Sequence, residues 1–189
     1  MTAVIVAEPA VAAPGCAANL LEPLLGARRA AALAAELWRR ARAWAAEIGG
    51  GSVLCLPACG AAALEAAVED GFAAGHDAVL IASPWLPRWR PEHGRDALED
   101  LAGGAGLTVG PLFDGGFYLV GLAAPAPGLP GRLVVGDRRN PFELAAAIAT
   151  EVGLVLGMLR AERGLRTAAD VRALLADPLT DADLRRRLV

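Results

Sequence analysis

The chain has 189 residues, a length that predicts one domain over residues 1–189, burying roughly 70% of its unfolded surface. Alanine and leucine dominate its 55% apolar content, so we expect a core of small, closely packed side chains. All 18 basic residues are arginine, which excludes a lysine nucleophile, a Schiff base or a Walker-type phosphate loop. The net charge of −3 gives no electrostatic reason to expect nucleic acid.

The sequence contains neither a membrane-span pattern nor a metal-binding spacing of cysteines. No apolar run reaches the roughly 20 residues of a membrane span, and Met1–Val6 is typical of a first strand rather than a signal peptide. We therefore expect a cytoplasmic protein. Cys16, Cys55 and Cys59 do not form a zinc-type pattern with the two histidines. They are interpreted as buried small hydrophobes, with a redox pair of Cys55 and Cys59 as the alternative.

The first half of the chain alternates short apolar runs with longer alanine- and leucine-rich segments, which predict strands and helices respectively. In chain order these are a strand at Val4–Val6, a helical turn at Leu20–Leu25, a helix at Arg28–Ile48, a strand at Val53–Leu56, a helix at Ala61–Ala74 and a strand at Ala78–Ala82. This alternation is typical of βαβ units and a mainly parallel, buried sheet.

The second half continues the alternation, with proline and capping residues at helix starts. It predicts a helix at Glu92–Leu101, strands at Leu107–Val109 and Phe117–Leu122, a flexible segment from Ala123 to Gly131, a helix opened by Asn140, a strand at Leu154–Leu159 and two helices opened by Thr167 and Thr180. Right-handed crossovers then place helices on both faces of the sheet.

The most informative stretch is GPLFDGGFYLVGL, from Gly110 to Leu122. Asp114, Gly115 and Gly116 directly precede an apolar segment typical of a buried strand. The two glycines supply the positive φ of a tight turn and let a ligand or another backbone come close.

This run resembles the Asp-Gly-Gly-Tyr-Tyr-Leu-Ile-Gly-Leu signature of a bacterial GT-A-like transferase family. The family is usually labelled glycosyltransferase and is related to the molybdenum-cofactor and phospholactate guanylyltransferases. Pro14–Leu21, Gly71–Ala82 and Leu165–Val171 resemble its opening, central-strand and closing segments. The resemblance implies an α/β fold, a three-layer α/β/α sandwich of the GT-A, or nucleotide-diphospho-sugar-transferase, type with a mainly parallel sheet.

The family's chemistry needs a basic cradle for the phosphates of a nucleotide or nucleotide sugar, and acids that hold Mg²⁺ or Mn²⁺. The resemblance implies basic residues where this chain has Ala18 and Leu20, and a lysine where it has Glu8. It implies acids where this chain has Trp85 and Arg166. We therefore expect no metal cofactor and the loss of metal-dependent transfer.

Asp114 is the acid that remains at a motif position, and it is the candidate catalytic residue, as a base or as an acceptor for a ligand hydroxyl. The alternative is a turn aspartate that caps backbone N–H groups. Gly115, Gly116 and Ser83 are candidate ligand-binding residues at the same sheet edge. Tyr118 is interpreted as a core residue.

The segment from Pro84 to Pro91 replaces the implied metal corner with two tryptophans and two arginines. These residue types are enriched at binding hot spots, and tryptophan stacks on bases and sugars. Trp85 and Arg88 are therefore candidate ligand-binding residues, and the Trp85–Arg90 loop is a candidate surface for a homodimer or a protein partner. The alternative is that both rings cover the core.

Three functional hypotheses follow from these residues and the resemblance. The first is a degenerate transferase-family member that binds a small ligand or a protein partner without metal-dependent transfer. The second is an active glycosyltransferase or nucleotidyltransferase whose phosphate contacts come from Arg28, Arg88 or Arg90. The third is a structural or oligomeric protein.

Overall fold

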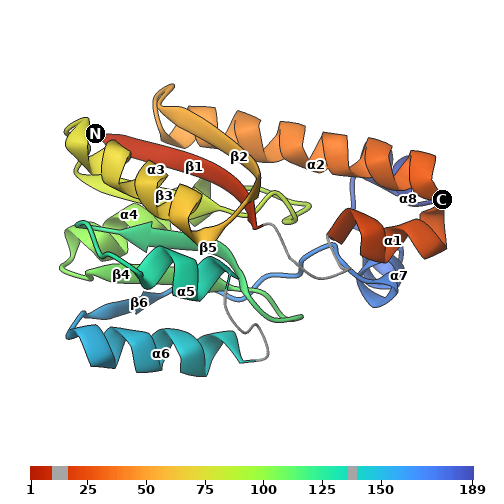
Figure 1. Cartoon of the computed structure of the whole chain (residues 1–189). Helices are drawn as coiled ribbons and strands as arrows, with labels where there is room; N and C mark the ends of the chain where they lie inside the picture. The colour runs from red at the N-terminus through yellow and green to blue at the C-terminus, as the bar shows by residue number, and fades with distance from the viewer. Residues whose placement is uncertain (10–16, 136–139) are drawn as a thin grey trace.

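A computed structural model describes residues 1–9, 17–135 and 140–189, in which strands alternate with helices (Figure 1). The first half contains β1 (Thr2–Pro9), α1 (Ala17–Leu25), α2 (Ala27–Ile48), β2 (Val53–Cys59), α3 (Ala61–Ala73) and β3 (Ala78–Ala82). The second half contains α4 (Pro91–Ala102), β4 (Leu107–Pro111), β5 (Phe117–Leu122), α5 (Leu129–Val135), α6 (Pro141–Val152), β6 (Leu156–Met158), α7 (Ala168–Ala176) and α8 (Ala182–Leu188). Cys16 and the start of the opening segment, Pro14, lie outside the described residues.

The strands form one sheet in the order β2-β1-β3-β5-β4-β6. β1 pairs in parallel with β2 and β3, and β4 pairs in parallel with β6. β5 is antiparallel to both of its neighbours, because a tight turn joins it to β4 and reverses the chain. The predicted mainly parallel sheet is confirmed, and so is the prediction that the first three strands are neighbours.

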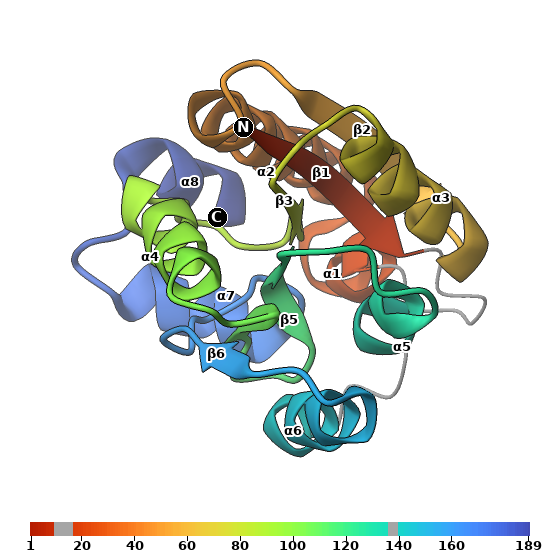
Figure 2. The ribbon, with the colours of Figure 1, turned by 90° about the vertical axis from the view of Figure 1, so that its left-hand side faces the viewer.

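Helices cover both faces of the sheet and make the expected α/β/α sandwich (Figure 2). Side chains alternate between the two faces along each strand, so neighbouring residues of β1 belong to different cores. Ile5 belongs to the core that also contains residues of α3, α5 and α6, and Val4 belongs to the core that also contains residues of α2 and α4. Both residues are at most 2% exposed.

A third apolar cluster lies beyond the carboxyl ends of the strands, where α1, α7 and α8 gather around the N-terminal half of α2 (Figure 1). Leu33 and Leu37 of α2 and Leu184 of α8 are fully buried in it. Arg40 of α2 also bonds Asp181 at the start of α8, with Nη1 and Oδ2 2.6 Å apart. We call this group of helices the helical cap, and it bounds the sheet edge at which ligands bind in open α/β folds.

Local capping signals in the sequence placed some helix starts correctly and missed others. Asn140 accepts a bond from the backbone N–H of Glu143, and Thr167 forms a capping box, as predicted. Thr180 does not open α8, which is capped by Asp181 instead. The prediction of a flexible segment from Ala123 to Gly131 is wrong at its end, because α5 begins at Leu129.

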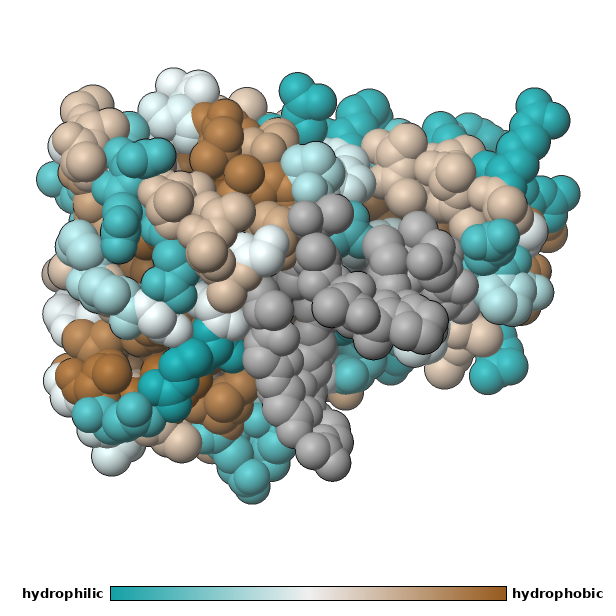
Figure 3. Space-filling model, viewed as in Figure 1, coloured by the Kyte–Doolittle hydropathy of each residue, from teal (hydrophilic) through white to brown (hydrophobic). Residues whose placement is uncertain are grey.

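Among the described helices none is both long enough and apolar enough to cross a bilayer. In the view of Figure 3, hydrophobic surface lies over β2 and over α6. Its exposed apolar residues include Leu54 of β2 (45% exposed) and Val152 of α6 (46% exposed). These side chains lie far from the Asp-Gly-Gly turn, and β2 is an edge strand of the sheet.

Candidate functional site

The candidate site lies at the edge of the sheet where β1, β3 and β4 end and β5 begins. The turn from Asp114 to Gly116 joins β4 to β5 at this edge. Ser83 follows β3, and its backbone N–H donates to the carbonyl of Tyr118 at 2.8 Å. Ser83 and the turn therefore lie at the same edge, as expected from the sequence.

The turn has the backbone conformation that its glycines predict. Gly115 has φ 94° and Gly116 has φ 77°, values that residues with a side chain rarely adopt. The N–H of Leu112 donates to the carbonyl of Gly116 at 3.0 Å, which closes the turn. The turn is thus fixed by its own sequence, and it presents the Asp114 carboxylate at the sheet edge.

Arg166 meets this carboxylate from the loop before α7. Its Nη1 lies 3.6 Å from Asp114 Oδ2 and 3.4 Å from the carbonyl oxygen of Gly115, to which it donates. The side chains of Arg166 and Asp114 are only 13% and 17% exposed. Asp170, at the start of α7, holds the backbone N–H of Arg166 at 3.2 Å. A guanidinium thus stands beside Asp114 where the family resemblance implies a metal-binding acid.

The residues at this edge do not fit a divalent metal ion. Mg²⁺ and Mn²⁺ need several oxygen ligands, and Asp114 already faces a positive charge. In the ranges that the structure describes, no three His, Cys, Asp or Glu side chains are grouped so as to hold a metal. Beside the Asp-Gly-Gly turn, the Asp114 carboxylate instead faces the Arg166 guanidinium.

Glu8, at the end of β1, contacts Trp85, in the loop after β3. The resemblance implies other residue types at both positions. Oε1 of Glu8 accepts from the indole N–H of Trp85 at 3.1 Å, and its Oε2 accepts from that of Trp38 at 3.3 Å. The resemblance implies a lysine and an aspartate at Glu8 and Trp85. The two positions still meet here, but the acid now lies on β1 and the donor on the loop after β3.

The interpretation of the Trp85–Arg90 loop as an exposed partner surface is wrong for its two rings. Trp85 is 4% exposed and packs with the leucines of the helical cap. Trp89 is half-buried and stacks on Trp44 of α2, with ring centroids 4.0 Å apart. The alternative, that the rings cover the core, is the one observed. The cap that covers Trp85 is built from segments distant in the sequence, so no pattern near Trp85 indicates it.

The loop arginines are engaged with acids of the C-terminal segment. Arg88 pairs with Asp177 and also donates to Thr180 Oγ1 at 3.1 Å. Arg90 pairs with Glu162. Of these two candidate phosphate ligands, Arg88 therefore fastens the loop to the end of α7 in the helical cap, and Arg90 fastens it to the segment after β6. Arg28 lies exposed near the start of α2.

His93, a buried residue in the first turn of α4 after the Trp85–Arg90 loop, was not identified from the sequence as part of any site. His93 is 5% exposed, its Nδ1 accepts from the backbone N–H of Arg90 at 3.3 Å, and its Nε2 lies 3.4 Å from Glu162 Oε1. Burial lowers the pKa of His93, which favours the neutral ring. Tyr118, buried as expected, lies 5.1 Å from this ring. The only local sign was a histidine at the third position of a helix opened by proline.

Comparison with solved structures places this architecture in a known class. The chain is similar to a protein from Desulfovibrio desulfuricans G20 described as a "putative nucleotide-diphospho-sugar transferase", with 17% identity, a TM-score of 0.80 and coverage of 99% of this chain and 93% of that chain. It is also similar to Rv0371c from Mycobacterium tuberculosis H37Rv, with 18% identity, a TM-score of 0.50 and coverage of 94% and 98%. At these identities the likeness shows the fold, which is that of a nucleotide-diphospho-sugar transferase.

The family follows from the sequence match. The model of the family described as "Uncharacterized protein conserved in bacteria (DUF2064)" matches residues 26–132. The chain belongs to this family. No curated protein matches it.

Proposed function

We propose that the protein binds a nucleotide or nucleotide sugar at the carboxyl edge of the sheet without a divalent cation, as a degenerate relative of nucleotide-dependent transferases. The fold supports the class of ligand, because open α/β sheets bind ligands beyond the carboxyl ends of their strands. The single observation that carries the proposal is the position of Arg166, which places a positive charge beside Asp114.

Arg166 has the chemistry to replace part of a metal's role. Guanidinium groups form charge-assisted, often bidentate hydrogen bonds with phosphate oxygens, and they keep their charge at any working pH. Nη1 of Arg166 contacts Asp114 and Gly115, whereas its buried Nε makes no hydrogen bond in the described part of the chain. Since the protein encloses this Nε, the donors that Arg166 can offer an anionic ligand are its terminal nitrogens.

The second sequence hypothesis, an active transferase with phosphate contacts from Arg88 or Arg90, receives less support. Both side chains already pair with acids, Asp177 and Glu162. Recruiting them would break ion pairs that hold the loop to the end of α7 and to the segment after β6. Arg166 also pairs with an acid, Asp114, but at the longer distance of 3.6 Å and within the turn at which we propose that the ligand binds.

A thermal-shift titration with UDP, GDP, UDP-glucose and GDP-mannose tests the proposal, with EDTA in one series and Mg²⁺ or Mn²⁺ in the other. A ligand present at about 100 times its Kd should stabilise the fold by roughly 2.7 kcal/mol. We expect equal stabilisation in the two series and its loss in Arg166→Gln. Arg160→Gln, at an exposed arginine of the same segment, is the matched control.

A different result of the same titration would contradict the proposal. Stabilisation that requires the metal and disappears in Asp114→Asn would contradict metal-free binding. It would support the metal-dependent transferase instead.

A further inference from the structure

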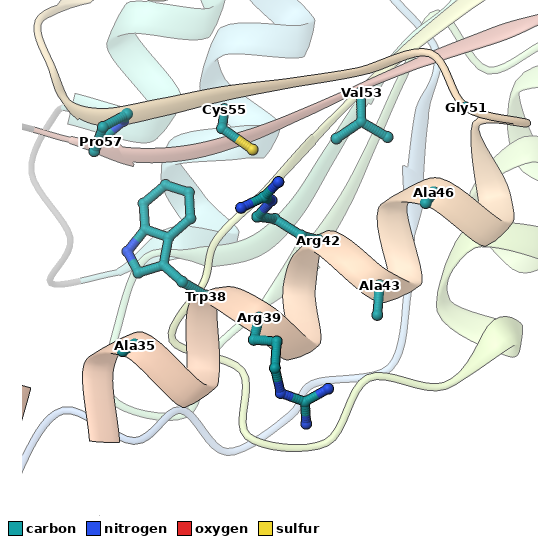
Figure 4. A pocket seen from close by; sticks show the side chains of 10 residues that line it. All are labelled: Ala35, Trp38, Arg39, Arg42, Ala43, Ala46, Gly51, Val53, Cys55 and Pro57. Atoms are coloured by element: carbon teal, nitrogen blue, oxygen red, sulfur yellow. The ribbon is translucent and has the colours of Figure 1, made fainter. Parts of the chain in front are cut away.

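A groove between α2 and the edge strand β2 is separate from the carboxyl-edge site. Its volume is about 770 Å³, within the range of roughly 300–1,000 Å³ that small-molecule sites occupy. One helical stripe of α2 and alternate residues of β2 form its walls (Figure 4). The lining residues are Ala35, Trp38, Arg39, Arg42, Ala43 and Ala46 of α2, Gly51, and Val53, Cys55 and Pro57 of β2.

The groove exists because the α2 side chains at its wall are small, whereas larger side chains normally fill the space between a helix and a sheet. Ala35, Ala43 and Ala46 recur at helical spacing on the side of α2 that lines the groove. β2 is the last strand of the sheet, so no further strand covers this side. The walls are mainly apolar, so they favour a ligand with a flat apolar part, such as an aromatic ring.

Trp38 supplies an aromatic surface that is held in place. Figure 4 shows its ring rising from α2 toward β2, while Cys55 and Val53 point from β2 toward α2. Its indole N–H donates to Glu8 Oε2 at 3.3 Å, which fixes the ring orientation. An occupant of the groove can therefore stack on a preoriented ring.

The groove also contains the guanidinium of Arg42, which can bind an anionic group. Arg42 points from α2 into the groove (Figure 4), and it makes no ion pair with any described residue. Arg39 points away, and its Nε and Nη2 donate to Glu36 at 2.8 and 2.6 Å. None of the described residues that line the groove is an acid, so its charge complements an anion.

We propose that this groove binds a small amphipathic anion, with an aromatic or otherwise flat apolar body against Trp38 and Cys55 and one carboxylate, sulfonate or phosphate on Arg42. The site goes beyond the proposed nucleotide site and uses none of its residues. Glu8 accepts hydrogen bonds from both Trp38 and Trp85. An occupant that stacks on Trp38 is therefore linked through Glu8 to the loop after β3.

The test uses 1-anilinonaphthalene-8-sulfonate, an aromatic sulfonate with this chemistry, titrated into the folded protein by fluorescence. We expect one binding site, and an affinity that Arg42→Gln weakens by about tenfold or more because a charge-assisted bond is lost. Arg29→Gln, at an exposed arginine of the same helix that does not line the groove, should leave the affinity unchanged within about twofold. Melting curves of both variants confirm that the fold is intact.

A second measurement locates the probe. In a Cys16→Ser background, modification of Cys55 by 5,5′-dithiobis(2-nitrobenzoate) should slow when the probe saturates the site, since Cys55 lines the groove and Cys59 is buried. Equal affinity in Arg42→Gln, or an unchanged rate at Cys55, would overturn the proposal. A dimer in sedimentation that binds no probe and buries Cys55 would assign the groove to a second copy and also overturn it.

Discussion

Arg166 and Asp114 form an ion pair between the closing segment of the chain and the Asp-Gly-Gly turn, with Nη1 and Oδ2 3.6 Å apart. The same Nη1 donates to the carbonyl of Gly115 at 3.4 Å. Both side chains are less than one-fifth exposed, so solvent screens the pair less than it screens a surface pair. The contact neutralises the one acid of the turn and fastens the loop before α7 to the sheet edge.

A double-mutant cycle measures this relationship. Asp114→Asn, Arg166→Gln and the double variant should give a coupling energy of about 1 kcal/mol, above the centre of the range for exposed pairs because both groups are partly shielded. Urea unfolding of the four proteins provides the free energies. Strictly additive effects of the two changes would mean that the groups do not interact in solution.

The tryptophan at the implied metal corner should behave as a core residue. Trp85 is 4% exposed and donates to Glu8, so Trp85→Ala should cost roughly 3–5 kcal/mol of stability, as large aromatic truncations do. Phe113→Ala removes a ring that is 67% exposed, and it should change stability by less than about 0.5 kcal/mol. Thermal and urea melts make the comparison. A stable Trp85→Ala variant with a lowered oligomeric state would restore the partner-surface interpretation.

The sequence predicted most of the fold because the relevant signals are local. Apolar runs and capping residues specified the strands and several helix starts, and Asn140 illustrates this with its bond to Glu143. α5 was missed because its start is capped from another helix. Glu65 of α3 accepts from the N–H groups of Gly128 and Gly131 at 2.6 and 3.3 Å. A cap supplied across the tertiary structure leaves no pattern in the segment that it caps.

The same limit applies to the candidate site. The residue types at Trp85 and Arg166 indicated altered chemistry at the metal corner, but their partners could not be inferred from spacing. Trp85 is buried because helices from both ends of the chain cover it. Arg166 meets Asp114 because the chain after β6 returns to the β4–β5 turn. Both outcomes depend on long-range packing rather than on neighbouring residues.

Gly110 should tolerate no side chain, because the Tyr118 ring lies against its backbone. A Cβ at this position would be 2.3 Å from Cζ of Tyr118. Gly110→Ala should therefore destabilise the protein by about 1–3 kcal/mol through overpacking. Gly60→Ala is the matched control, because Gly60 has φ −81° and nothing within 4 Å of its Cβ position. Equal melting temperatures for the two variants would show that Tyr118 can move aside.

Acid should remove the stabilisation that Glu36 provides within the N-terminal half of α2. Glu36 is 7% exposed and accepts bonds from Arg39 at 2.8 and 2.6 Å and from Arg40 at 2.7 Å. The bonds from Arg39, with help from Arg40, lower the pKa of Glu36 from 4.5 to about 2, against the opposing effect of burial. The unfolded chain therefore takes up a proton at Glu36 at a higher pH than the folded protein does.

This order of protonation determines the sign of the pH dependence. The stabilisation from Glu36 is fully present above pH 4.5 and is lost as the pH falls toward 2, by roughly 2–3 kcal/mol. Glu36→Gln should lower stability at neutral pH and remove this part of the acid dependence. Glu47→Gln, at an exposed acid of the same helix, should keep it. Urea unfolding between pH 2 and 6 makes the comparison, and parallel profiles for Glu36→Gln and Glu47→Gln would contradict the assignment because the acid-labile stability would then come from other carboxylates.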